Sequence, residues 1–285
     1  MNSSEHLDEH ALPGEGPVEY DGSAADLYGA AQSIGDRACQ CDATATHTTD
    51  SGVRSYVLLD GIGDNPAVRA WVEAAADRLA VLAAVHGDAE KALRAERDRY
   101  AAEPERDPEH GRPSLPAAAA VVAVHVPGGT LSVSWSGDAR AYLLLDDGVL
   151  RLVTDDHNER RAYDGLGDRH TLTACLGVTR SDEETEKQWG HPAVETVRGP
   201  ARPGRLLLVS DGAYEPHEDA DDDMAGYLAG PPGAGAQRLV EDAVRKARAV
   251  PRARGRGRAR ADNATALVGV LDSPPVRPTS TTAGE

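Results

Sequence analysis

Residues 141–153 read AYLLLDDGVLRLV, and in this stretch two short apolar runs, 141–145 and 149–153, are joined by Asp146-Asp147-Gly148. An Asp-Gly pair between apolar runs is a strong signal for a β-hairpin, because these residues tolerate the backbone of a tight turn. Other short apolar runs bounded by Gly, Pro or Asp occur at residues 27–34, 54–59, 121–126, 131–135, 194–197, 206–210 and 264–271. Since these runs follow one another with few helices between them, we expect antiparallel sheets.

Two stretches have the composition of helices. Residues 67–102 are rich in Ala and Leu with interleaved Arg and Glu, which predicts one long helix or a helical pair. Asn65 and Pro66 precede this stretch and are typical of a helix N-cap and a first helical position. Residues 237–250 predict a second helix. Helices outside antiparallel sheets make the expected fold class α+β.

The two ends of the chain differ from the region between them. Residues 1–25 are polar and lack periodicity, and residues 273–285 contain three prolines and a Ser/Thr run. We therefore expect a disordered leader and a disordered tail around one domain that spans residues 26–272.

Charge and cysteine content exclude several classes of protein. The 285 residues carry a formal net charge of −17, which argues against binding to nucleic acid or to an anionic membrane. No apolar stretch reaches the length of a membrane span, and the first residues do not resemble a secretory signal. Three cysteines are not the pattern of a disulfide scaffold. We expect a cytoplasmic protein.

One basic segment interrupts this acidity. From Arg245 to Arg260 the sequence contains eight Lys and Arg residues and no acidic residue. The simpler interpretation is a solvated surface loop. The alternative is a docking surface for an acidic or phosphorylated partner.

Four aspartates lie where apolar runs begin or end: Asp60, Asp138, Asp211 and Asp262. A carboxylate at the end of a buried strand is costly to desolvate unless it meets a cation or hydrogen-bond donors. One such aspartate is usually a turn residue, whereas four in one sheet system suggest a common site. Ligands that are all oxygen suit Mg²⁺ or Mn²⁺, and such a centre fits the hydrolysis of a phosphate ester.

At these residues the sequence resembles the bacterial form of the metal-dependent protein phosphatase 2C family of Ser/Thr phosphatases. The segments that carry the resemblance follow the order of the family motifs: GDRACQCDA (35–43), LLDGIGD (58–64), WSGDARAYLLLDDGVLRLVTDDH (135–157), LTACLG (172–177), LLLVSDGAYE (206–215) and DNATALVGVLD (262–272). The resemblance covers about residues 28–272. It implies an αββα sandwich, in which two antiparallel sheets are flanked by helices and metal ions lie at one edge of the sheet pair.

The resemblance also implies a ligand set for two Mn²⁺ or Mg²⁺ ions. Asp60 would bridge the two ions. Asp211 and Asp262 would complete the first site, and the carbonyl of Gly61 would bind the second ion. Asp138, together with Asp211, would hold a third and more weakly bound ion.

The remaining roles that the resemblance implies belong to Arg37 and Asp42. Arg37 would hold the phosphate of a phosphorylated protein substrate, for which its planar guanidinium is suited. Asp42 would hydrogen-bond a metal-bound water, and a water bridging the metals at Asp60 would attack the phosphorus of phosphoserine or phosphothreonine.

Three features depart from this pattern or compete with it. Cys41 stands where the family has Glu or Gln beside the second metal, and a buried structural thiol is the alternative there to a reactive one. Ile62 stands where some relatives have a His that is a candidate proton donor. Asp156 and His157 suggest an acid–base pair, although the resemblance places them in a structural turn.

Two other functions stay open. A catalytically impaired pseudophosphatase that binds phosphoproteins would be expected to have lost at least one metal aspartate, yet all are present. A phosphatase of the branch that acts on anti-sigma-factor antagonists would share these aspartates. Arg37 and the hairpin at residues 137–148 favour the protein phosphatase 2C branch.

Overall fold

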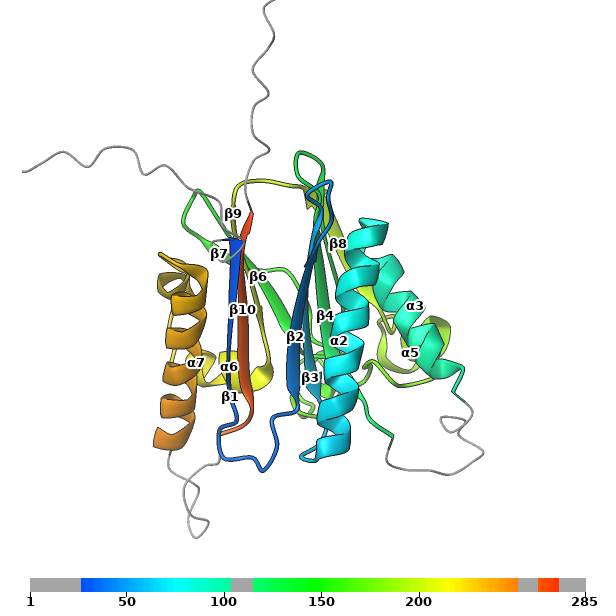
Figure 1. Cartoon of the computed structure of the whole chain (residues 1–285). Coiled ribbons are helices and arrows are strands. Elements are labelled where there is room, and N and C mark those ends of the chain that lie inside the picture. Colours follow the sequence, from blue (N-terminus) through cyan, green and yellow to red (C-terminus); the bar gives the residue numbers. More distant parts are fainter. Residues whose placement is uncertain (1–26, 104–114, 251–260, 272–285) are drawn as a thin grey trace, which may run out of the picture.

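The computed structural model describes residues 27–103, 115–250 and 261–271, and within them two antiparallel sheets face each other between helices (Figure 1). The first sheet has the order β1-β10-β9-β6-β7, with the bounds β1 Tyr28–Ser33, β10 Ala264–Leu271, β9 Gly204–Val209, β6 Arg140–Leu145 and β7 Leu150–Leu152. The second has the order β2-β3-β4-β5-β8, with the bounds β2 Asp42–Thr48, β3 Arg54–Gly61, β4 Ala118–His125, β5 Thr130–Ser136 and β8 Glu195–Pro200.

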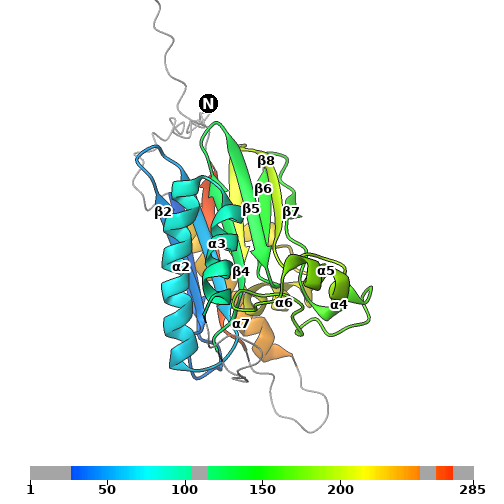
Figure 2. The same cartoon turned by 90° about the vertical axis from the view of Figure 1, so that its right-hand side faces the viewer.

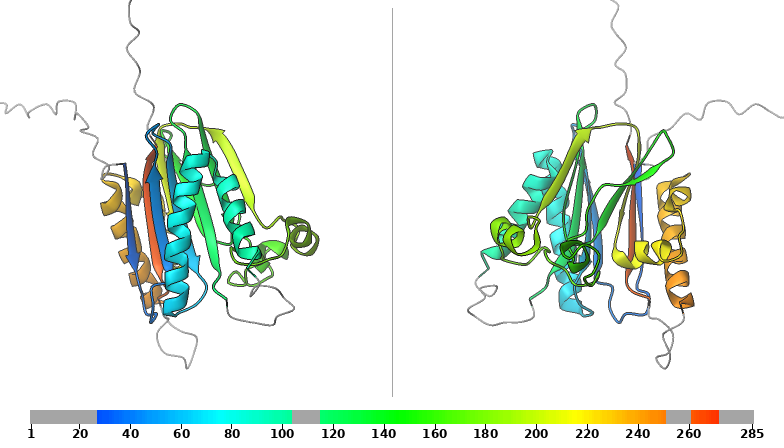
Figure 3. Two further views of the ribbon diagram at one scale, coloured as in Figure 1. Left: turned by 45° about the vertical axis from the view of Figure 1, so that its right-hand side comes forward. Right: turned by 180° about the vertical axis from the view of Figure 1, so that it is seen from behind.

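Helices cover both outer faces of the sandwich (Figures 1 and 3). On the second sheet lie α2 Pro66–His86 and α3 Ala89–Ala101, and on the first lie α6 Asp211–Glu218 and α7 Pro232–Ala249, with a 3₁₀ turn, η3 Met224–Leu228, beside α7. Two shorter helices, α4 Glu159–Ala162 and α5 Asp182–Trp189, stand out from the side of the sandwich (Figure 2).

The alternation of side chains along the strands builds three apolar layers. In β3, Tyr56 and Leu58 face the other sheet, whereas Val57 and Leu59 pack toward α2. Successive residues of a strand point to opposite faces, so a strand covered on both sides needs apolar side chains on both faces, as residues 56–59 of β3 and 118–124 of β4 have. Small Ala, Val and Leu side chains fill these layers, together with Tyr56, Tyr100 and Trp135.

The predicted fold class and the αββα arrangement are confirmed. The helical stretch is a pair, because Gly87 ends α2 in the left-handed region with φ 62° and Asp88 caps α3. The second predicted helix, α7, begins at Pro232, five residues before 237. Strand β2, helices α4, α5 and α6, and the 3₁₀ turn η3 have no counterpart among the predicted elements.

Several sequence predictions fall on residues that the structure leaves out. The leader at 1–25, the tail at 273–285 and the part of the basic segment at 251–260 lie outside the described residues. Within the described ranges, no helix combines the length and the apolar composition needed to cross a membrane.

Candidate active site

The four aspartates singled out in the sequence meet at one end of the sandwich, the lower end in Figure 1. Asp60 is near the end of β3, Asp211 is the first residue of α6, Asp262 precedes β10, and Asp138 lies in the turn between β5 and β6. All four line one cavity of about 310 Å³. The other residues that line it are Arg37, Gly61, Ile62, Gly63, Ala119, His170, Leu172 and Asn263.

Asp42 lies beside this cavity, at the start of β2, where it pairs in register with Asp60 of β3. Its carboxylate is buried, and its Oδ2 accepts hydrogen bonds from the hydroxyls of Thr265 at 2.6 Å and Ser210 at 3.0 Å. Its Oδ1 is equally buried and has no hydrogen-bond partner among the described residues. A buried carboxylate oxygen without a partner requires a water or a cation near it.

The carboxyl groups repel one another. Burial raises the pKa of Asp60 and of Asp138 well above its usual range, and neighbouring carboxylates raise it further. Burial and Asp262 likewise raise the pKa of Asp211, and burial raises the pKa of Asp42 to about 7. Several carboxylates that repel one another would be stabilised by positive charge, and oxygen ligands suit hard divalent cations such as Mn²⁺ or Mg²⁺.

Arg37 is the cation that reaches the carboxylates, and its guanidinium forms an ion pair with Asp262. The loop that carries it is fixed from both sides. Gly35 has φ 62°, and a Cβ there would lie 2.1 Å from the carbonyl oxygen of Asp262. On the other side, the carboxylate of Asp64 accepts the backbone N–H groups of residues 38 and 39 at 3.1 and 2.7 Å.

Cys41 is turned away from the cavity. Its carbonyl accepts the N–H of Gly61 at 3.1 Å, and its thiol packs under α2 at 3.7 Å from the carbonyl of Asn65. Burial raises the pKa of this thiol, which disfavours a reactive thiolate. Cys41 therefore supports the backbone of Gly61 and offers no side-chain ligand, whereas Ile62 is half exposed and lines the cavity.

Two residues near the carboxylates were not singled out in the sequence: His170, which lines this cavity, and Glu215, which lines a neighbouring cavity. His170 belongs to the segment after α4, and its ring nitrogen lies 3.7 Å from a carboxylate oxygen of Glu215. Burial and Asp211 raise the pKa of Glu215 to about 8, and Arg169 pairs with this carboxylate at 3.1 Å. The sequence could have indicated Glu215, because it lies within segment 206–215, one helical turn after Asp211. It could not have indicated His170, which lies in a loop that has no sequence pattern.

Comparisons with known proteins show which solved structures share this fold. No family model and no curated protein matches the chain. Among solved structures, the serine/threonine phosphatase Stp1 from Staphylococcus aureus has a TM-score of 0.64 at 16% identity, covering 91% of this chain and 100% of that one.

Two further bacterial structures give the same result. The Mycobacterium tuberculosis serine/threonine phosphatase PstP/Ppp has a TM-score of 0.60 at 24% identity, over 86% of this chain and 98% of that one. The S. agalactiae serine/threonine phosphatase has a TM-score of 0.62 at 19% identity, over 85% and 98%. The chain has the fold of these bacterial Ser/Thr phosphatases, as the sequence resemblance implies.

Proposed function

We propose that this protein is a cytoplasmic Mn²⁺- or Mg²⁺-dependent phosphatase of the protein phosphatase 2C type, which hydrolyses phosphoserine and phosphothreonine in proteins. The observation that carries this proposal is the convergence of four strand-end aspartates and Arg37 on one cavity, in a fold shared with bacterial Ser/Thr phosphatases.

The carboxylates would hold the metal ions in the arrangement expected from the sequence. Asp60 would bridge two ions, Asp211 and Asp262 would complete the first site, and the Gly61 carbonyl would bind the second ion. Asp138 and Asp211 would hold a weaker third ion. When bound, the ions supply Lewis acidity, which lowers the pKa of water and neutralises charge on the phosphoryl oxygens.

The side chains of the protein bind and orient the substrate. Arg37 has five N–H donors in a planar fork, so it can bind phosphate oxygens while it keeps its ion pair with Asp262. The Oδ1 of Asp42, which has no hydrogen-bond partner among the described residues, would accept a hydrogen bond from a water and orient it. Ile62 has no titratable group, so a water or another side chain would have to donate the proton that the departing serine or threonine oxygen needs.

The intact carboxylate set favours an enzyme over the pseudophosphatase alternative, since the structure brings every one of the four aspartates into the cavity. The branch that acts on anti-sigma-factor antagonists would use the same cavity. It differs in substrate: that alternative predicts turnover of a phosphorylated antagonist and none of unrelated phosphopeptides.

The test is hydrolysis of p-nitrophenyl phosphate and of a phosphothreonine peptide with Mn²⁺, with Mg²⁺ and with EDTA, for the unmodified protein and for Asp211→Asn. We expect turnover that requires the metal and falls by more than about 100-fold in Asp211→Asn, since even residues that only support metal ligands commonly cost 10- to 100-fold. Asp50→Asn makes the same substitution at an exposed residue in the turn between β2 and β3, at the other end of the sandwich, and should leave the rate unchanged.

Absence of metal-dependent turnover in the unmodified protein would favour the pseudophosphatase. Turnover that survives Asp211→Asn would refute the assignment of the site.

A further inference from the structure

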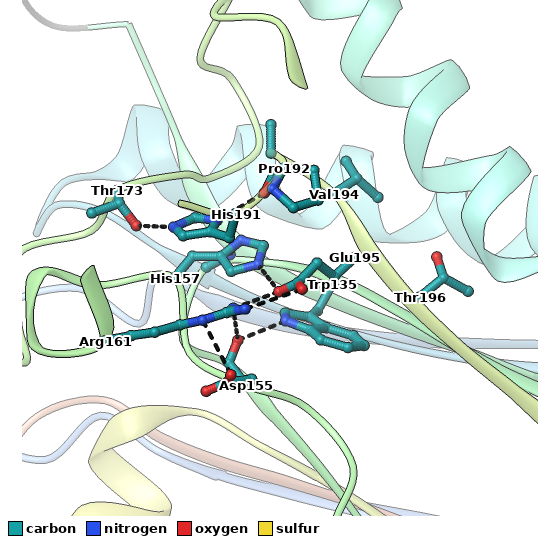
Figure 4. A network of polar contacts seen from close by, with 12 residues as sticks. Trp135, Asp155, His157, Arg161, Thr173, His191, Pro192, Val194, Glu195 and Thr196 are labelled. Atoms are coloured by element: carbon teal, nitrogen blue, oxygen red, sulfur yellow. Dashed lines mark hydrogen bonds and ion pairs between the residues drawn. The ribbon is translucent and has the colours of Figure 1, made fainter. Parts of the chain in front are cut away.

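A second group of polar side chains forms a network of contacts (Figure 4). It joins Arg161 of α4 to Gly137, the residue before Asp138, through Glu195 and His157. Its centre is a pair of stacked imidazoles, His157 and His191, whose ring centroids are 4.3 Å apart at an interplanar angle of 20°. Both rings are buried, and Glu195 at the start of β8 faces them. Ligand atoms of these three residues lie within 4.8 Å of one another, so the group must first be considered as a metal site.

Hydrogen bonds within the protein already occupy all four ring nitrogens. His157 Nε2 is 2.8 Å from a carboxylate oxygen of Glu195, and His157 Nδ1 is 3.4 Å from the backbone nitrogen of Gly137. His191 Nδ1 is 2.8 Å from the carbonyl of Pro192, and His191 Nε2 is 2.7 Å from the hydroxyl of Thr173. The group is therefore a hydrogen-bond network in which neither imidazole has a free nitrogen to offer an ion.

The partners determine which nitrogen of His157 carries the proton. A carboxylate only accepts, so Nε2 donates to Glu195 and the bare Nδ1 accepts from the N–H of Gly137. Burial lowers the pKa of His157, which keeps the ring neutral. Arg161 of α4 holds Glu195 in place through hydrogen bonds of 2.5 and 3.1 Å to its two carboxylate oxygens.

The ring of His157 accepts a hydrogen bond from Gly137, the residue before Asp138. The two residues share a second hydrogen bond in the opposite direction, in which the backbone N–H of His157 donates to the Gly137 carbonyl at 3.0 Å. Gly137 has φ 122°, and a Cβ there would lie 2.5 Å from the Cβ of Ala119, so its backbone is confined as well. Asp138, the next residue along the chain, is buried and lines the cavity.

We propose that His157 is a positioning residue for Asp138. The neutral ring, oriented by Glu195 and stacked on His191, would hold Gly137 so that the Asp138 carboxylate meets the third and weakest metal ion. This inference rests on the proposed function, in which Asp138 is a ligand of that ion. Because Arg161 belongs to α4, the same network would couple the projecting α4–α5 region to this ligand (Figures 2 and 4).

The sharpest test uses two variants that lose the ring and its stacking equally but keep different hydrogen bonds. His157→Asn places an oxygen near the position of Nδ1 and retains an acceptor for Gly137. His157→Gln reaches the position of Nε2 and retains a donor for Glu195, but has no acceptor near Gly137. His86→Gln, at an exposed residue at the end of α2, is the control, and thermal unfolding reports whether each variant folds.

Mn²⁺ binding is followed by titration calorimetry, and turnover by hydrolysis of p-nitrophenyl phosphate. We expect His157→Gln to weaken the low-affinity class of Mn²⁺ sites by about 10- to 100-fold and to leave the tighter class intact. We expect His157→Asn to retain most of this binding, because it keeps the acceptor for Gly137, and His86→Gln to bind Mn²⁺ as the unmodified protein does. Equal losses in both His157 variants, or none in either, would overturn the proposal.

The proton on His157 is tested on the unmodified protein by proton–nitrogen correlation spectra of the imidazoles. They should show a proton on Nε2 and none on Nδ1, and a proton on Nδ1 would overturn the proposal however the variants fold. The two proposals fail in different ways: absence of Mn²⁺-dependent turnover counts against the proposed function, whereas the tautomer and the pattern of the Asn and Gln variants decide the role of His157.

Discussion

Asp42 and Asp60 show what the site costs the protein at the scale of single residues. Asp42 is buried and Asp60 partly buried, and desolvation together with neighbouring carboxylates raises the pKa of each. A bound cation opposes that shift, because it stabilises the ionised carboxylates and displaces their protons. Metal binding and proton release should be linked at these residues.

The linkage predicts a pH dependence for Mn²⁺. A carboxyl with a raised pKa in the folded state contributes stability that is fully present below the pKa of the unfolded chain. This contribution is lost as the pH rises to the folded pKa, which for Asp42 is about 7. Bound Mn²⁺ replaces the protons, so it should raise the melting temperature more at about pH 8 than at about pH 6. Its apparent affinity should increase about tenfold per pH unit for each proton displaced.

The measurement is thermal unfolding and Mn²⁺ titration at both pH values, starting from EDTA-treated protein. Asp42→Asn removes one of the titrating groups and should reduce the difference. A Mn²⁺ effect that is equal at both pH values, or larger at the lower one, would contradict the linkage.

The convergence of the four strand-end aspartates on one cavity could be predicted from sequence for a physical reason. Asp60 and Asp211 each follow an apolar run that has to be a buried strand, so their positions in space follow from the sheet edge. His170 reaches the same cavity from a loop, where neither periodicity nor a turn signal determines direction. Cys41 shows a further limit, because the sequence places it next to Asp42 and only the structure shows that its thiol points under α2.

At the scale of elements, the start of α2 determines where the loop after Asp60 ends. Asn65 caps the helix, since its Oδ1 accepts the N–H groups of Ala67 at 3.0 Å and Val68 at 3.1 Å, and Pro66 follows it as expected from the sequence. The side chain is exposed, so its contribution is that of the cap rather than of burial.

Asn65→Ala should lower the free energy of unfolding by about 1 kcal/mol, because two N–H groups of the first turn lose their acceptor. Asn65→Asp keeps an acceptor at the same position and should stay close to the unmodified protein. Urea unfolding of the three proteins measures this difference. If Asp destabilised the protein as much as Ala does, the cap would not explain the effect.

The elements that the sequence did not predict share a short length or a polar composition. Strand β2, DATATHT, is at the edge of its sheet and is only partly buried along most of its length, so it lacks the apolar run that marked the other strands. Helix α6 has eight residues and contains Pro216, and it reads as a turn after the Asp211-Gly212 pair. Both matter for the site, because β2 places Asp42 and α6 begins at Asp211.

At the scale of the whole molecule, the protein has a net charge of −17, yet its site is proposed to bind a phosphate, which is also negative. The described part of the basic segment, from Arg245 to Arg248, does not form a separate positive surface, because each of its cations forms an ion pair with an aspartate. Arg245 pairs with Asp242, Lys246 with Asp222, and Arg248 with Asp36. Arg252 to Arg260 lie outside the described residues, and their recruitment of acidic partners stays a prediction.

The overall field predicts which phosphopeptides reach the cavity fastest. A negative protein repels an acidic peptide and attracts a basic one, and salt screens both effects. At low ionic strength, a phosphothreonine peptide flanked by arginines should have a kcat/KM roughly 3- to 10-fold above that of the same peptide flanked by glutamates. The ratio should fall toward one as salt is added, while kcat changes little. The reverse preference, abolished by neutralising Arg252 to Arg260, would show instead that the basic segment outweighs the field of the whole protein and recruits acidic substrates.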